Sequence, residues 1–476
     1  GELSKEARNA AIQALGRMEA LSRQLGAKRT RVVATSAVRE ASNGKEFLAR
    51  VKLETGLDVT VLYGDDEARL SFRSAQAHFD LAAGRAAVID IGGGSLELAL
   101  SADGLVERLI SLPFGAIRLT EKYLSDGTTP KAMRRLRRAV RRGLKEEVSA
   151  RDWRGAQVIG SGGTFTNLAG IVLARQGVRT ARTVHGTIVQ RVELEHVVDR
   201  LAALSPAERQ SVQGLNTARA DIIVAGLAAV AEVIARLEAK SLAVSSYGIR
   251  EGILLELARV KPRSQDRGEA RERSVRELAE RTHYEAPHAK QVQKLALRLF
   301  DSIGARIGCE QEDRQTLADA ALLHDIGYHI NYDKHHKHSY HLITHADLLG
   351  MTPTEQLVIA NVARYHRGAE PRRSHPNYGP LARPQRERID RLSAILRVAD
   401  GLDRGHTAAV DDVRVRWLDR ALRLIPVPAA GATIRLELWG ASKKSALLAE
   451  LIGLPVEIVA PDGRAFTVED DASRAD

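Results

Sequence analysis

Cysteine, aromatic side chains and long apolar runs are scarce in this chain of 476 residues. Cys309 is its single cysteine, so no disulfide can form within the chain, which fits a reducing cytoplasm. No apolar run reaches the roughly 18 residues that a membrane-spanning helix needs, and no signal-peptide pattern is present. Aromatic residues make up 4% of the chain, so its cores must rest on Leu, Val, Ile and Ala. We expect a soluble, cytoplasmic protein.

Acidic residues are outnumbered by basic ones, which leaves a formal net charge of +11. Such an excess favours a polyanionic partner. Much of it falls on one predicted helix, whose basic residues are Lys131, Arg134, Arg135, Arg137, Arg138, Arg141, Arg142 and Lys145. The apolar residues of that helix recur at three- and four-residue spacing: Met133, Leu136, Val140 and Leu144. The basic face is either solvated or a track for a polyanion, and salt-dependent affinity would separate the two.

A glycine-rich loop between two apolar runs is the most informative segment. Residues 88–98 read Val-Ile-Asp-Ile-Gly-Gly-Gly-Ser-Leu-Glu-Leu. Three consecutive glycines let the backbone turn tightly at positive φ and approach a ligand, and their N–H groups can form a nest for an anion. Asp90 and Glu97 flank this nest, so a metal ion or an attacking water could lie between carboxylate and phosphate. A glycine-rich hairpin turn without a ligand is the alternative.

A second loop of the same kind covers residues 158–167, Val-Ile-Gly-Ser-Gly-Gly-Thr-Phe-Thr-Asn. A helical pattern begins at Thr164, and a glycine turn at a helix N-terminus presents backbone donors and the positive end of the helix dipole. Two such loops suggest a cleft that holds a phosphate-bearing ligand from both sides. Neither loop has the P-loop pattern, and neither has the spacing of a Rossmann dinucleotide site.

The first 260 residues alternate between strand and helix patterns. A helix is expected over 4–26, with an apolar stripe formed by Ile12, Leu15, Met18, Leu21 and Leu25. Two or three strands in a hairpin arrangement are expected over 86–110. We interpret this half as two α/β domains, residues 1–75 and 76–260.

The second half has a different pattern. Residues 261–274 are polar without an apolar period, so we expect a linker there. Helices are expected almost throughout 275–409. A small α+β domain, residues 410–476, is then predicted from strands at 411–417, 421–426, 432–438 and 455–460 and a helix at 442–452. Its last dozen residues are expected to fray.

Histidine and aspartate side chains fall on the apolar faces of these later helices. His324 follows Leu317 and Ala321 on one face, and His288 and Asp400 likewise share faces with aliphatic residues. A buried polar group needs partners, which a shared divalent metal ion supplies, and imidazole with carboxylate suits such an ion. The alternative is a helical domain whose core histidines are satisfied by hydrogen bonds.

The order His, His-Asp, Asp resembles the HD superfamily of metal-dependent phosphohydrolases. The candidate ligands of this second site are His288, His324, Asp325 and Asp400. Further histidines are candidates to line it: His338, His341, His345 and His366.

Taken together, residues 1–260 resemble the exopolyphosphatase and guanosine pentaphosphate phosphohydrolase family. The matching stretches, in the order and spacing of that family, are residues 35–41, 64–69, 90–98, 160–164 and 247–252. The resemblance implies an α/β fold with two actin-like, ribonuclease-H-like lobes, followed in longer members by an all-α HD-like domain. It also implies release of terminal phosphate from linear polyphosphate, and in some members conversion of pppGpp to ppGpp.

The resemblance assigns roles residue by residue. Glu67 matches the catalytic glutamate that orients or deprotonates the attacking water, and Asp90 and Glu97 match acidic residues that bind Mg²⁺ or position water. The expected phosphate-binding residues are Gly92, Gly93, Gly94, Ser95, Gly162, Gly163, Thr164 and Arg39. The implied cofactor is Mg²⁺ or Mn²⁺, with a second divalent metal in the HD-like domain, and the implied assembly is a homodimer. This arrangement suits phosphoryl transfer, which needs an aligned water, donors and charge neutralisation.

One departure from the family pattern concerns the start of the chain. The family opens with a strand hairpin that carries a first phosphate loop of the form Asp-x-Gly-Ser-Asn-Ser, and this sequence starts at the helix that would follow it. We therefore expect the first lobe to lack its N-terminal strands and to leave a sheet edge exposed.

Two other functions remain open from the sequence. One is phosphoester hydrolysis in the HD-like domain, and the other is a non-catalytic sensor that binds polyphosphate or the alarmone. A sugar or acetate kinase is less favoured, because no adenosine pocket is recognisable. Membrane binding is not expected, and nucleic acid is the less favoured polyanion.

Overall fold

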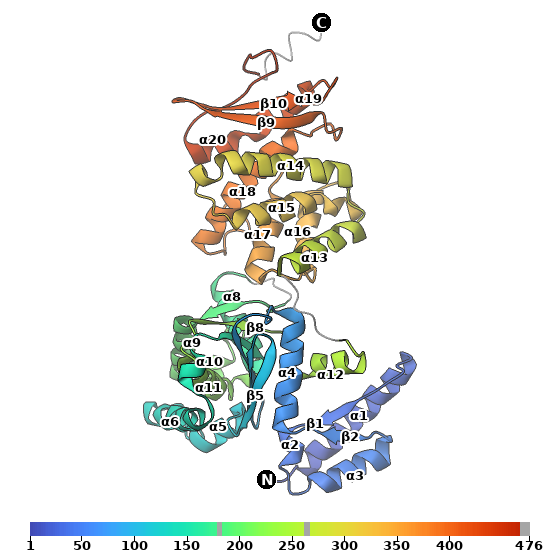
Figure 1. Ribbon diagram of the computed structural model, residues 1–476, viewed down its shortest axis with the longest axis vertical. Helices are drawn as coiled ribbons and strands as arrows, with labels where there is room; N and C mark the ends of the chain where they lie inside the picture. Colours follow the sequence, from blue (N-terminus) through green and yellow to red (C-terminus); the bar gives the residue numbers. More distant parts are fainter. Residues whose placement is uncertain (179–182, 261–266, 467–476) are drawn as a thin grey trace. The chain divides into compact units, whose positions relative to one another are not determined.

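The computed structural model describes residues 1–178, 183–260 and 267–466, which form two compact units (Figure 1). The described part of the first unit comprises residues 1–174 and 184–260, and that of the second comprises 175–178, 183 and 267–466. Both contain helices and strands, so the predicted α/β class is confirmed. The division into four domains stays a prediction, although helix α4 (Gly64–His78) crosses the boundary expected at residue 75.

The first unit is built on a six-stranded sheet in the order β5-β4-β3-β6-β8-β7. Its strands are β3 (Arg85–Ile91), β4 (Leu96–Ala102), β5 (Leu105–Leu112), β6 (Gln157–Ser161), β7 (Ile188–Gln190) and β8 (Ser241–Val244). Strands β3, β4 and β5 pair antiparallel, as the hairpin prediction required, while β6 pairs parallel with both β3 and β8. The two glycine loops therefore leave the sheet from neighbouring strands, β3 and β6.

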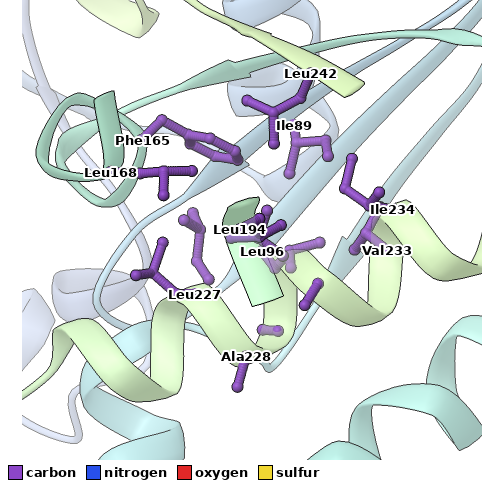
Figure 2. Packing of buried hydrophobic residues seen from close by; sticks show 14 of the residues in the cluster. Ile89, Leu96, Phe165, Leu168, Leu194, Leu227, Ala228, Val233, Ile234 and Leu242 are labelled. Carbon is purple, nitrogen blue, oxygen red and sulfur yellow. The ribbon is translucent and has the colours of Figure 1, made fainter. Parts of the chain in front are cut away.

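Helices bury one face of this sheet in a large aliphatic core, part of which Figure 2 shows. They are α5 (Ala116–Tyr123), α6 (Pro130–Glu147), α7 (Ala150–Trp153), α8 (Gly163–Arg175), α9 (Arg191–Ala203) and α11 (Ile223–Arg236). The short helices α10 (Pro206–Arg209) and η1 (Thr217–Arg219) lie between α9 and α11 along the chain. Every residue of α11 from Ile223 to Ile234 is buried. Each buried Leu, Ile or Phe contributes roughly 1.5–3 kcal/mol, so this core fixes the strands that carry the site.

The opposite face of the sheet is covered by α4. Ala68, Phe72 and Ala75 of that helix pack against Val88 and other small aliphatic residues of β3, β4 and β6. Helix α12 (Ile249–Leu257) packs against α4 so closely that a Cβ at Gly252 would lie 2.2 Å from the carbonyl oxygen of Leu70. These contacts fix the position of α4, whose first turn contains Glu67.

The first 63 residues form a small two-stranded parallel sheet with three helices. The strands are β1 (Val32–Ala34) and β2 (Val59–Val61), and the helices are α1 (Lys5–Gln24), α2 (Ser36–Arg39) and α3 (Gly44–Thr55). The predicted stripe of α1 is only partly buried. Ile12 packs against Phe47 and Val51, but Met18, Leu21 and Leu25 are exposed because the contact with α3 ends near Leu15.

The second unit begins with six helices. They are α13 (Arg267–Arg281), α14 (Ala286–Ile303), α15 (Asp313–Leu323), α16 (His335–His345), α17 (Pro353–Arg364) and α18 (Arg383–Gly401), with short turns η2 (Ala305–Ile307) and η3 (Ile326–His329). A three-stranded sheet in the order β11-β10-β9 follows, with β9 (Val410–Trp417), β10 (Leu422–Pro428), α19 (Arg435–Lys444), α20 (Ala446–Ile452) and β11 (Val456–Ile458).

Two predictions for this unit were wrong. The linker expected over 261–274 ends early, because α13 begins at Arg267; Arg271 lies buried and donates to Asp319 at 2.5 Å, which explains a helix without an apolar period. The strand expected at 432–438 does not form: α19 begins at Arg435, and Ile434, Leu438 and Ala441 are buried at helical spacing.

Residues 261–266, which belong to that linker, and residues 467–476, where fraying was expected, lie outside the described residues. Among the helices of the described residues, none has both the length and the apolar character to cross a membrane.

Candidate functional sites

Three buried carboxylates meet in the first unit. Asp90 at the end of β3 lies directly opposite Glu97 on β4, and alternation along the strands turns both toward the sheet face that α4 covers. Glu67 enters from the first turn of α4. The exposed fractions of Glu67, Asp90 and Glu97 are 4%, 8% and 2%. The structure therefore brings together the three acidic residues expected from the sequence.

Each carboxylate has a fixed hydrogen-bond donor. The guanidinium of Arg39 donates to Glu67 Oε1 at 2.7 Å. Ser71 Oγ donates to Asp90 Oδ2 at 2.8 Å, and Ser111 Oγ donates to Glu97 Oε1 at 3.0 Å. The two serines come from α4 and β5, so neighbouring elements hold the carboxylates in place.

Burial raises the pKa of all three carboxylates. Burial, together with the charges of Glu67 and Asp90, raises the pKa of Glu97 to about 8, against hydrogen bonds from Ser95 and Ser111. Burial likewise raises the pKa of Asp90 and, despite Arg39, that of Glu67. A divalent cation with oxygen ligands would relieve this concentration of negative charge, so the donor set fits Mg²⁺ or Mn²⁺.

The first glycine loop turns without the positive φ that was expected of its glycines. None of Gly92, Gly93 and Gly94 has positive φ. Side chains lie close to two of them: a Cβ at Gly93 would lie 2.9 Å from Ile117 Cδ1, and one at Gly94 would lie 2.5 Å from Ser36 Oγ. The N–H of Gly92 donates to the carbonyl of Ser95 at 3.0 Å, which closes the turn.

A cavity of about 340 Å³ lies beside this loop. Gly93, Gly94 and Arg118 line it together with Thr35 and Ser36 of the first 63 residues. Glycine keeps the loop backbone open to this space, which has a guanidinium on one side.

The second glycine loop lies against Asp90. Gly162 has φ +91°, and a Cβ there would lie 2.8 Å from Asp90 Oδ1. Gly163 starts α8, and the guanidinium of Arg219 covers it so closely that a Cβ would lie 2.1 Å from Arg219 Cζ. The side chain of Thr164 is buried against Gly226, which leaves only its backbone for a ligand. Sequence reasoning missed Arg219, because nothing in its local pattern marks it.

The four candidate metal ligands of the second unit also meet. His288 lies on α14, His324 and Asp325 follow α15, and Asp400 lies on α18. The Nε2 atoms of His288 and His324 are 3.3 Å apart, and both lie 3.6–3.8 Å from Asp400 Oδ1. The side chains of His288 and His324 are 0% exposed, and those of Asp325 and Asp400 are 10% exposed. The ligand atoms of His288, His324 and Asp400 lie close enough together to share one ion, whereas Asp325 groups with His324 and His366 or with His288 and His406.

Two further histidines contact Asp325. His366 was a candidate, and its Nε2 lies 3.4 Å from Asp325 Oδ1. His335 was not anticipated, and its Nε2 lies 3.1 Å from the same oxygen. His341 and His345 lie exposed on the surface of α16, so for them the prediction was wrong. The run of histidines in 329–345 carries no period that could have singled out His335.

Outer partners orient these ligands. Asp403 accepts from His288 Nδ1 at 2.8 Å, and the ammonium of Lys444, from α19, pairs with Asp400 Oδ2. Burial alone would lower the pKa of His288, but hydrogen bonds to Asp400 and Asp403 and nearby carboxylate charges raise it to about 9. Burial holds the pKa of His324 and His366 below the usual histidine value. Outer-shell carboxylates of this kind are typical of histidine metal sites.

Comparisons with known proteins agree with both halves of the chain. A sequence model of the Ppx/GppA phosphatase family matches residues 1–260, and a model of Ppx/GppA phosphatase domain III matches residues 270–424. A solved Ppx/GppA family structure from Aquifex aeolicus is 29% identical, with a TM-score of 0.48 over 54% of this chain and 83% of that one. A solved exopolyphosphatase from Cytophaga hutchinsonii is 26% identical, with a TM-score of 0.51 over 56% of this chain and 86% of that one.

Proposed function

Because the chain belongs to the Ppx/GppA phosphatase family, and is therefore a phosphohydrolase, we propose that its first unit releases terminal orthophosphate from inorganic polyphosphate. Conversion of pppGpp to ppGpp is proposed as a second reaction of the same site. The observation that carries the proposal is the cluster of Glu67, Asp90 and Glu97 between two glycine loops.

Glu67 is the proposed general base. It is buried, its pKa is raised by that burial, and Arg39 holds one of its oxygens, so the other can orient a water. A carboxylate with a raised pKa is a better proton acceptor near neutral pH. The water oxygen bonds to the terminal phosphorus, the bridging P–O bond breaks, and the shortened chain leaves as its phosphate anion.

Asp90 and Glu97 are the proposed ligands of Mg²⁺ or Mn²⁺. When bound, the ion supplies charge neutralisation at the terminal phosphate oxygens. Backbone N–H groups of residues 93–95 and 162–164 are proposed to hold those oxygens, with Arg219 beside Gly163 as a further cation. Together they would align the phosphorus with the water, which is most of what phosphoryl transfer requires.

The decisive test replaces Glu67 by Gln, which keeps the shape of the side chain and removes its basicity. Phosphate release from long-chain polyphosphate and from pppGpp is measured with Mg²⁺ and with Mn²⁺. Release should fall by about 10²–10⁴-fold while polyphosphate binding persists. The matched control is Asp65→Asn, an exposed carboxylate in the same turn of α4, which should be neutral. Normal release by Glu67→Gln would contradict the assignment, and tight binding without turnover in the unmodified chain would favour a sensor.

A second proposal concerns the second unit, where His288, His324, Asp325 and Asp400 are proposed to bind a divalent transition metal. The ligand atoms of His288, His324 and Asp400 lie within 4.8 Å of one another, and so do those of His324, Asp325 and His366, which supports it. Equilibrium dialysis with Mn²⁺ or Zn²⁺ should find an ion that is lost in His288→Ala, and no loss in that variant would reject the proposal.

A further inference from the structure

The first glycine loop is held between two helices of the first unit. The first three N–H groups of α5 donate to carbonyls of the loop, at 2.9 Å to Gly92 and at 3.0 and 3.1 Å to Gly93. On the other side of the loop, Ser36 Oγ of α2 would lie 2.5 Å from a Cβ at Gly94. The loop is therefore fixed against both helices, and so are the backbone positions of the side chains that these helices carry.

An ion pair connects the two helices across this loop. Arg118 of α5 pairs with Glu40, the C-cap residue of α2. The guanidinium lies close to the loop, because Arg118 Nη2 would be 3.7 Å from a Cβ at Gly94. The side chains of Arg118 and Glu40 are 34% and 44% exposed. An ion pair this accessible contributes little to stability, so a stronger anion can replace the carboxylate.

The cavity of about 340 Å³ beside the loop has room for such an anion. Arg118 and Glu40 both line it, whereas none of its described lining residues is one of the three site carboxylates. The end of α2 links the two places, since Arg39 donates to Glu67 and the next residue, Glu40, pairs with Arg118. The cavity is thus a neighbour of the reacting site and not part of it.

The charges around the cavity favour a phosphate that belongs to a chain. Among the described side chains that line it, Arg118 is the one cation, and Glu2, Glu40 and Glu121 are carboxylates. A phosphate can bind a guanidinium through two oxygens. When that phosphate is linked to one already bound, its effective concentration is high, and it competes with Glu40 better than free orthophosphate does.

We propose that Arg118 is a substrate-binding residue, which leaves Glu40 and binds the chain phosphate next to the one that is released. Glu40 is then a specificity-determining residue, because it competes with that phosphate for Arg118. The inference rests on the function proposed above for the first unit and defines one subsite of it. No bond forms or breaks at Arg118, so its loss should raise KM and leave kcat unchanged.

The test compares Arg118→Gln, Glu40→Gln and the double variant in the full chain. Affinity for tripolyphosphate is measured by isothermal titration calorimetry with Glu67→Gln present in every chain, which prevents hydrolysis of the ligand. Orthophosphate is titrated separately, because a single phosphate occupies only the position of the released group. The matched control is Glu121→Gln, which removes another carboxylate from the same cavity.

Arg118→Gln should weaken tripolyphosphate binding about tenfold, and Glu40→Gln should strengthen it about threefold. Once Arg118 is replaced, the gain from Glu40→Gln should fall to the smaller gain from Glu121→Gln, because only the general repulsion between carboxylate and phosphate is left. Affinity for orthophosphate should change little in any variant. With Glu67 intact, Arg118→Gln should raise KM for tripolyphosphate about tenfold at unchanged kcat.

A purely structural ion pair would give a different result, since both single variants would then weaken binding and lower the urea-unfolding midpoint. That result would overturn the proposal, as would an equal gain from Glu40→Gln with and without Arg118, or an equal loss of orthophosphate affinity in Arg118→Gln. If Arg118→Gln does not fold, stronger binding by Glu40→Gln still decides, because misfolding does not strengthen binding.

Phosphate release by the unmodified chain separates this inference from the function on which it rests. Absent release together with the expected binding pattern would reject the proposed reaction and support the subsite. Normal release together with unchanged tripolyphosphate binding in Arg118→Gln would reject the subsite alone.

Discussion

Burial shifts the pKa of candidate metal ligands in both units, upward for a carboxylate in the first unit and downward for imidazoles in the second. In the first unit, burial and neighbouring charges raise the pKa of Glu97 to about 8, so the carboxyl holds a proton at neutral pH until a cation replaces it. In the second unit, burial lowers the pKa of His324 and His366 and keeps both imidazoles neutral. Neutral imidazole is the form that binds metal.

Burial should also make the thiol of Cys309 react more slowly than an ordinary thiol. Burial, with the charge of Asp313, raises the pKa of its thiol to about 12 although Arg388 and Arg391 oppose the shift. At pH 8 the thiolate fraction is then roughly a thousandfold below that of an ordinary thiol, partly offset by the stronger nucleophilicity of a more basic thiolate. Alkylation by iodoacetamide should run about 50-fold slower than for N-acetylcysteine and recover in urea. Equal rates for the folded chain and N-acetylcysteine would contradict this.

Sequence reasoning could identify those site residues whose own neighbours mark them as unusual. Asp90 and Glu97 interrupt apolar runs, and His288 interrupts the apolar stripe of a helix. Each of them is therefore predicted to be a buried polar residue of a functional site. Residues such as Arg219 and Lys444 carry no such mark. They reach the sites only because α8 and α18 pack against the turns or helices that hold them, which a local pattern does not encode.

At the scale of helices, a glycine-to-alanine substitution should lower the free energy of unfolding at one position and raise it at another. Gly252 of α12 has no room for a Cβ beside the backbone of α4, so Gly252→Ala should destabilise the first unit by about 1–3 kcal/mol. Gly16 of α1 has nothing within 4 Å of that position, so Gly16→Ala should stabilise it by about 0.5–1 kcal/mol through helix propensity. Urea-unfolding midpoints would measure both, and a neutral Gly252→Ala would show that α12 can move away.

Helix α13 explains why some elements were predicted wrongly. Its sequence is so polar that it reads as a linker, yet Arg271 is buried and held by Asp319 and Glu355. A salt bridge between elements leaves no periodic apolar signal. Helix α19 was predicted as a strand, because its start alternates apolar and polar residues. In the structure, burial of Ile434, Leu438 and Ala441 follows the spacing of a helix.

Across the whole molecule, the charge excess is not all available to a partner. In α6 the predicted apolar stripe is buried at Leu136, Val140 and Leu144. Arg137 pairs with Glu195 and Glu232, and Arg141 pairs with Glu232, so these two guanidiniums bind α9 and α11. The exposed basic residues of the helix outside these ion pairs are Lys131, Arg134, Arg135, Arg138, Arg142 and Lys145, while the paired Arg141 keeps 70% of its side chain exposed. A polyanion track along α6 would therefore rely mainly on the residues outside the ion pairs.

Reversing three of those charges, in Arg134→Glu/Arg135→Glu/Arg138→Glu, tests the track. Long polyphosphate can reach α6 while its end is in the site, so its affinity should fall about tenfold at low salt, whereas tripolyphosphate should be little affected. The difference should shrink as salt shortens the screening length from about 10 Å at 0.1 M to about 3 Å at 1 M. The control, Lys5→Glu/Arg17→Glu/Lys28→Glu, makes the same change in net charge at exposed positions of the first unit. Equal losses in both triple variants, or equal losses for both chain lengths, would mean that α6 contributes only to the general positive field and offers no track.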